Sequence, residues 1–135
     1  MSAEFRTLCH SLGLSAQALA DYVRVSKRSA EHWFADGTPP QGVLDDVLKL
    51  DALIQHTIQQ VIDVLVDATD TMERAPEDVE LVAYRTADAW HAAHPEYKGL
   101  PIQTHSIMLA RTRQALAQIG VNTIITYTNR TVPRE

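Results

Sequence analysis

The stretch LSAQALADYVRVSKRSAEHWFADGTPP, residues 14–40, predicts two short helices joined by a tight turn. Ser15 is expected to cap the first helix, because its short side-chain oxygen accepts a hydrogen bond from a free amide of the first turn. That helix should run through Val23, and Ser26 should cap the second helix. The apolar residues of the second helix recur at helical spacing and form an expected buried stripe of Ala30, Trp33 and Phe34.

Polar side chains are concentrated on the other side of the second helix, most of them near its start. A recognition helix meets the base edges and phosphates of DNA with its N-terminal residues, and that end also carries the positive macrodipole. We therefore expect this helix to enter the major groove. The residues predicted to contact DNA are Gln17, Arg24, Ser26, Lys27, Arg28, Ser29 and His32.

The spacing of ten residues across this stretch resembles the Cro and phage-repressor (XRE-type) helix-turn-helix domain. They are Leu14, Ser15, Leu19, Ala20, Val25, Ser26, Trp33, Gly37, Pro39 and Pro40. The resemblance implies a lambda-repressor-like helical domain with double-stranded DNA as its partner. The chain departs from the family pattern at Arg24, where the turn usually holds glycine, and a non-glycine residue at positive φ costs about 1 kcal/mol.

The composition is typical of a soluble globular protein, with 135 residues, 45% hydrophobic and 21% charged. No apolar run approaches the roughly 20 residues that span a bilayer, and no secretory signal pattern is present at the N-terminus. We therefore expect a cytoplasmic protein with no membrane partner. Cys9 is the only cysteine, and its apolar helical neighbours favour a place in the core.

The charge is unevenly distributed, and the net value is −5. Residues 56–95 contain two basic and eight acidic side chains, whereas residues 96–135 contain five basic and two acidic ones. Neutralisation of phosphates is the main source of non-specific affinity for nucleic acid, so this balance argues against indiscriminate binding. DNA would therefore be contacted by only a few cationic side chains around Lys27. Because one copy of the chain offers so few contacts to DNA, we expect it to act as a homodimer.

We predict two regions, a helix-turn-helix DNA-binding domain in residues 1–55 and an accessory α+β region for dimerisation or sensing in residues 56–135. A helical pattern begins near Gln41 and meets no breaker until Pro76. A helix of about 30 residues is roughly 45 Å long, which exceeds the diameter of a small DNA-binding domain. Its second half should pack on the C-terminal region of its own chain, either alone or together with the same helix of a second subunit, and we favour the second arrangement. Its solvated side should carry Asp63, Asp67, Asp70 and Glu73.

The predicted fold class is mainly α with a small C-terminal α+β part. It combines a lambda-repressor-like helical domain, a long connecting helix, and a two-stranded sheet with two helices. The strands are expected in residues 79–84 and 121–128, separated by a short helix capped by Thr86 and a longer helix ending at Ile119. On the longer helix we expect Ile119 to face inward and Arg111 to face outward.

The C-terminal region also resembles the bacterial YdiL-like family, which is itself uncharacterised and whose members carry an N-terminal Cro-like domain. The matching residues are Leu81-Val82-Ala83-Tyr84-Arg85, Trp90, His94-Pro95-Glu96, Gly99-Leu100-Pro101 and His105. The resemblance implies this two-part architecture. It implies no activity.

Three histidines form the only cluster in the sequence that could hold a metal, namely His91, His94 and His105. No carboxylate or cysteine completes the set at recognisable spacing, and His105 falls on an inward stripe, where a hydrogen-bonded core histidine is commoner. The sequence shows no phosphate-binding glycine loop, nucleophile elbow or acid-base pair. We predict no catalytic residue, no metal, no cofactor and no enzymatic activity.

Two functional hypotheses follow. The first is a sequence-specific transcriptional regulator that binds a palindromic operator as a homodimer and responds to an unidentified small-molecule or protein effector. The alternative is a protein-interaction module, such as an antitoxin-like partner binder, with a secondary DNA-binding role. Outward Lys27 and Arg28 favour the first hypothesis, because a purely structural helix needs no cations there. The acidic middle of the chain leaves the second open.

Overall fold

The computed structural model describes residues 2–35, 37–72 and 78–128. Their elements, in chain order, are α1 (Ser2–Ser11), α2 (Ala16–Val23), α3 (Lys27–Ala35), α4 (Gln41–Met72), β1 (Val79–Ala83), α5 (Ala87–Ala93), the 3-10 helix η1 (Pro95–Tyr97), α6 (Ile102–Gln118) and β2 (Thr123–Tyr127). This part of the chain is mainly helical with one two-stranded sheet, as predicted.

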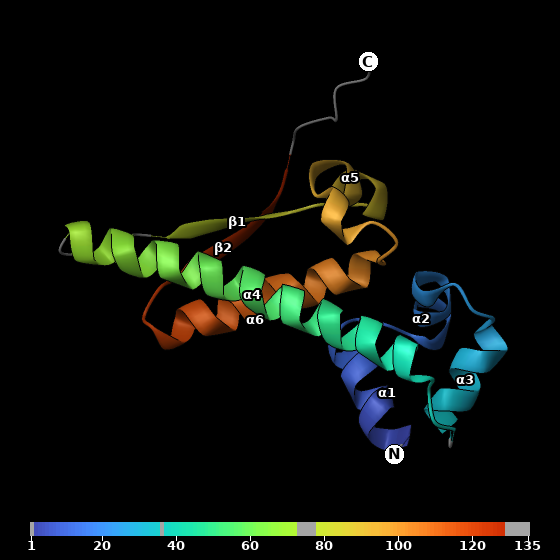
Figure 1. The fold of residues 1–135 in the computed structure, drawn as a ribbon. Coiled ribbons are helices and arrows are strands. Elements are labelled where there is room, and N and C mark those ends of the chain that lie inside the picture. Colours follow the sequence, from blue (N-terminus) through green and yellow to red (C-terminus); the bar gives the residue numbers. More distant parts are fainter. Residues whose placement is uncertain (1, 36, 73–77, 129–135) are drawn as a thin grey trace.

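The long helix α4 links the two ends of the molecule (Figure 1). Its first turns lie beside α1, α2 and α3, and its remaining length extends away from them toward the sheet. Helix α6 runs beside α4 and packs against it, and it also contacts both strands. The predicted long connecting helix is therefore present, and α6 is the element that touches both α4 and the sheet.

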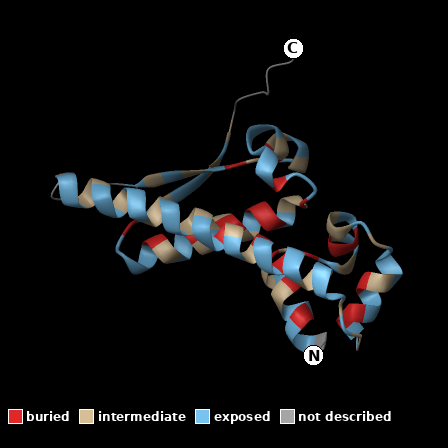
Figure 2. Cartoon of the chain, in the orientation of Figure 1, coloured by how far each residue is buried: buried red, intermediate tan, exposed pale blue. Residues whose placement is uncertain are grey.

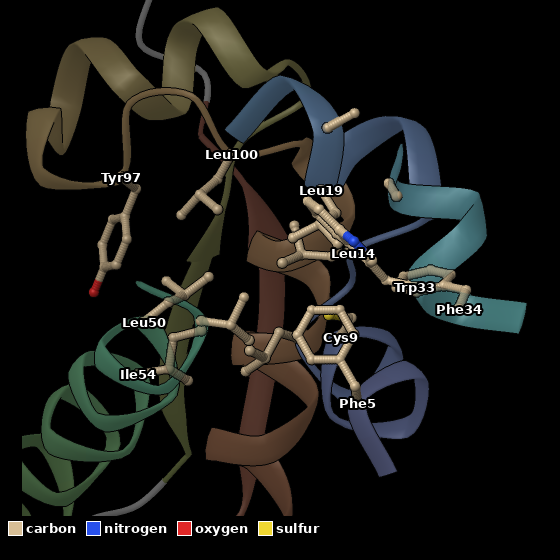
Figure 3. Close-up of a cluster of buried hydrophobic side chains, with 14 of the residues drawn as sticks. Phe5, Cys9, Leu14, Leu19, Trp33, Phe34, Leu50, Ile54, Tyr97 and Leu100 are labelled. Atoms are coloured by element: carbon tan, nitrogen blue, oxygen red, sulfur yellow. The ribbon is translucent and has the colours of Figure 1, made fainter. Parts of the chain in front are cut away.

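One hydrophobic cluster joins the N-terminal helices to the C-terminal half of the chain (Figure 3). The cluster is continuous across the domain boundary predicted after residue 55. Among its labelled members are Phe5, Cys9, Leu14, Leu19, Trp33, Phe34, Leu50, Ile54, Tyr97 and Leu100. Cys9 is completely buried, and burial raises the pKa of its thiol to about 12. The core position predicted for Cys9 is confirmed, and its thiol stays protonated near neutral pH.

Helix α6 holds the end of α1 through two side chains. The Thr104 hydroxyl, fully buried, donates to the Leu12 carbonyl oxygen at 2.7 Å. Arg111 donates from Nη2 to the Ser11 carbonyl oxygen at 2.6 Å and lies 3.7 Å from a carboxylate oxygen of Asp51. The prediction that Arg111 faces outward is wrong. Carbonyls at a helix C-terminus lack partners within the helix. Side chains of α6 supply hydrogen-bond donors for two such carbonyls at the end of α1.

The turn between α1 and α2 approaches the first turn of α6 closely. Gly13 adopts φ +76°, and a Cβ atom there would lie 2.7 Å from the backbone nitrogen of Thr104. A larger residue would therefore be strained in conformation and would also collide with α6. Glycine at this position lets the end of α1 rest directly on α6.

The two halves of α4 differ in burial (Figure 2). Val47, Leu50 and Ile54 are buried, but no residue of α4 described beyond Ile54 is. Val64 is 66% exposed, so the chain's own C-terminal region does not cover this apolar side chain. The predicted solvated residues Asp63, Asp67 and Asp70 are exposed, whereas Glu73 lies outside the described residues.

Strands β1 and β2 pair in parallel, with Val79 opposite Thr123 and Ala83 opposite Tyr127. Parallel sheets normally have both faces covered. Here Val82 and Ile124, which share one face by this register, are exposed. A two-stranded sheet of this kind needs support from elsewhere, and α6 provides it on the other face.

The prediction that Ile119 faces inward is wrong. The side chain of Ile119 is 45% exposed, whereas Val121 is buried. Helical periodicity stops at Gln118, and Gly120 at φ +81° turns the chain toward β2. An inward position extrapolated from the helical pattern therefore fails at Ile119.

Thr104→Val should lower the free energy of unfolding by about 1 to 3 kcal/mol, because it leaves the buried Leu12 carbonyl without its partner. Urea denaturation followed by circular dichroism measures the change. Thr112→Val is the matched control, since the buried Thr112 hydroxyl bonds the Met108 carbonyl within α6 itself. That carbonyl also accepts a backbone helical bond. Equal losses in the two variants would contradict a special role for Thr104.

Candidate nucleic-acid interface

Helix α2 begins and ends as the sequence predicted. The Ser15 side chain accepts a hydrogen bond from the Ala18 amide at 3.1 Å. After Val23 the chain turns at Arg24, which is left-handed at φ 61° and ψ 51°. The Arg24 amide and the next amide both donate to the Ala20 carbonyl. Arginine tolerates this conformation at a cost of about 1 kcal/mol, and the result is a tight connection into α3.

Helix α3 begins with a serine cap. The Ser29 amide donates to Ser26 Oγ at 3.1 Å, and the two hydroxyl oxygens are 2.9 Å apart. The predicted cap at Ser26 is confirmed. Whichever hydroxyl is the donor in that pair, the Ser29 oxygen can still accept a further hydrogen bond, because it has two lone pairs.

The apolar stripe of α3 is buried as predicted. Ala30 is fully buried, and Trp33 and Phe34 are each 9% exposed. The Phe34 ring lies edge-on to the Phe5 ring, with 6.0 Å between the ring centroids. Contacts with both α1 and α2 fix this stripe inward. The opposite side of α3 is therefore held toward solvent.

Lys27 and Arg28 occupy the first turn of α3, and both are exposed. No carboxylate among the described residues forms an ion pair with either of them. No acidic residue occupies the first turn of this helix. Cations at the positive end of a helix dipole are unfavourable by about 0.3 to 1 kcal/mol each. The first turn of α3 is thus an exposed cationic end suited to bind an anion.

The other predicted contact residues lie in two places. Arg24, exposed, lies two residues before the α3 cap at Ser26. The His32 ring lies against Gly37, where an added Cβ would approach His32 Cδ2 to 2.7 Å. Gln17 belongs to α2, donates to Asp21 at 2.9 Å, and lines a cleft together with His91. Five of the predicted residues lie on one continuous segment, whereas Gln17 belongs to the preceding helix; the five are Arg24, Ser26, Lys27, Arg28 and Ser29.

The three histidines share aromatic neighbours, since Tyr84 lies near the His94 and His105 rings and Trp90 near the His91 and His105 rings. His105 is 7% exposed, its Nε2 accepts the Tyr84 amide at 3.1 Å, and burial with nearby His94 lowers its pKa. The hydrogen-bonded core position predicted for His105 is confirmed. His91 Nε2 lies 2.8 Å from the Leu100 carbonyl oxygen. Nowhere in the described ranges do three or more histidine, cysteine or acidic side chains gather as a metal site.

The aromatic residues beside these histidines fill the core. Trp90 stacks on Tyr97 with 5.0 Å between ring centroids, and both are buried. The Tyr97 hydroxyl lies 2.9 Å from the Thr57 hydroxyl, which connects η1 to α4. This connection was not predicted, because nothing in the local pattern of either residue identifies a partner forty positions away.

The structure also places two unpredicted arginines, Arg85 and Arg113, along one cleft beside α6. The only feature of the sequence that points to this cleft is the excess of basic over acidic side chains in residues 96–135, which include Arg113.

No protein-family model matches the chain, and no curated protein matches it. Neither the Cro-like resemblance nor the YdiL-like resemblance is tested by that result, and both stay predictions. None of the helices described here combines the length and the apolar character needed to cross a membrane.

Proposed function

We propose that this chain is a sequence-specific DNA-binding regulator of the XRE helix-turn-helix class, and that α3 enters the major groove. One observation carries the proposal. Lys27 and Arg28 are adjacent, exposed and without a carboxylate partner in the described structure, at the start of a serine-capped helix whose other side is buried. Side chains in this position can reach base edges and phosphates together.

The electrostatics favour selective binding over indiscriminate binding. The net charge of −5 repels a polyanion in general, and exposed Asp63, Asp67 and Asp70 make the distal half of α4 unfavourable near DNA. The start of α3 is therefore the surface where a duplex can approach. We place the regulator in the cytoplasm, together with its DNA.

A homodimer completes the proposal. Among the described residues, seven of the eight large apolar side chains that are exposed lie beyond residue 55, in α4, in the sheet and at the end of α6. Val64, Val66, Val82, Ile119 and Ile124 are available to such an interface, whereas Ile125 and Tyr127 lie on the opposite face of the sheet and line a cleft beside α6. A stable interface buries about 800 Å² of each partner, and an apolar concentration of this kind supports one. The two-fold axis would set two α3 helices about 34 Å apart, or a multiple of that, on a palindromic operator.

The alternative is an antitoxin-like protein-interaction module, and one observation supports it. Two of the exposed apolar residues, Val64 and Val66, lie on the same segment of α4 as the exposed aspartates, so a basic protein could cover both. In that case the cationic start of α3 would serve a secondary role. The two functions differ in whether Lys27 and Arg28 determine binding to DNA.

Lys27→Ala and Arg28→Ala should each weaken binding to the operator by about 1 to 3 kcal/mol if the side chain contacts a base. A phosphate contact would instead reduce affinity for all sequences and flatten the salt dependence. Fluorescence anisotropy with a labelled duplex across a salt series distinguishes these outcomes. Lys98→Ala, which removes one exposed positive charge from the C-terminal half, is the control and should change little. Unchanged binding in the Lys27/Arg28 double variant would exclude α3 as the reading element.

Val64→Glu combined with Ile124→Glu should convert the dimer to monomers, because each places a charge on an apolar surface that the isolated chain leaves exposed. Sedimentation equilibrium at micromolar concentration measures the mass. Leu48→Glu is the matched control, since Leu48 is 47% exposed but lies in the first half of α4. A wild-type chain that sediments as a monomer would contradict the homodimer.

A further inference from the structure

A cleft of about 840 Å³ lies between α6 and the carboxyl ends of the two strands. Ser106, Leu109 and Arg113 line it from α6, while Ile125 and Tyr127 line it from β2 and Arg85 follows β1. Sites for small molecules are typically of about 300 to 1,000 Å³ and combine an apolar lining with a few polar groups. The dimensions and lining of this cleft fit that description.

The charge of the cleft differs from that of the whole chain. Two arginines and no aspartate or glutamate line it, although the net charge of the chain is −5. Neither Arg85 nor Arg113 forms an ion pair with a carboxylate in the described ranges. The Arg85 guanidinium lies 4.0 Å from the centre of the Tyr127 ring, which holds this cation at the cleft. Both positive charges are therefore available to an anion.

The apolar side of the cleft determines the rest of the ligand. Leu109, Ile102 and Ile125 are lining residues, and Ile125 is 38% exposed. A wholly polar anion such as inorganic phosphate would leave these side chains in water. A molecule with an apolar body would bury them while its charged group meets an arginine, and each part of the lining would then have a partner.

We propose that this cleft binds an organic carboxylate with an apolar body, with Arg85 and Arg113 holding the carboxylate group. The site does not depend on the proposed DNA binding and can be tested without DNA. Its location matters because α6 also holds the end of α1 through Thr104 and Arg111. A ligand in the cleft thus contacts the same helix that holds α1, and α1 packs against α3.

Isothermal titration calorimetry with octanoate tests the proposal, and octanamide serves as the uncharged probe of the same length. Octanoate should bind the full chain at least about tenfold more tightly than octanamide, because hydrogen bonds between two ionised groups are stronger than those of a neutral amide. Arg113→Gln and Arg85→Gln should each weaken octanoate binding by about tenfold and leave octanamide binding unchanged. Arg6→Gln, on the exposed face of α1, is the matched control and should bind like wild type.

A steric variant tests the location without altering charge. Ala110 lines the cleft and is exposed, so Ala110→Trp should fill the cleft and abolish octanoate binding without unfolding the chain. Circular dichroism checks that the fold is intact. Absence of octanoate binding to wild type would overturn the proposed ligand class. Binding that survives Ala110→Trp and both arginine variants would overturn the proposed site.

Discussion

The hydrogen bond from the Thr104 hydroxyl to the Leu12 carbonyl joins positions that are 92 residues apart, and the rest of the arrangement depends on it. Gly13 lets the two backbones approach, and Arg111 satisfies the neighbouring Ser11 carbonyl. A buried carbonyl without a partner would cost about 1 to 3 kcal/mol, so α6 stabilises the α1 end that it meets. Because α1 and α2 both pack against α3, this contact indirectly fixes the direction in which α3 faces solvent.

The features that could be predicted from the sequence are those set by neighbours within one helical turn. The caps at Ser15 and Ser26, the buried stripe of Trp33 and Phe34, and the turn at Arg24 all follow from local hydrogen bonding and periodicity. The cationic start of α3 was predictable for the same reason. The local pattern predicts where these side chains lie, whereas their role in DNA binding is a proposal.

The features that were mispredicted or missed depend on residues distant in the sequence. Arg111 looked solvent-facing because its acceptor belongs to α1. The parallel pairing of β1 with β2 follows from the crossover through α5 and α6, and the alternation of polar and apolar residues does not reveal strand direction. The arginine-lined cleft likewise exists only when the strand ends and α6 come together. It unites side chains that no sequence motif relates, and the anion site that we propose there lies on the same helix that holds α1.

The central claim is that this chain reads a specific DNA sequence with two copies of α3. Selection of duplexes from fragmented genomic DNA by the purified full chain, followed by sequencing of the retained fragments, tests it most directly. The account predicts enrichment of a two-fold symmetric sequence whose half-sites are about 34 Å apart, or a multiple of that distance. Retention of no fragment above background, or retention without any shared sequence, would contradict the claim.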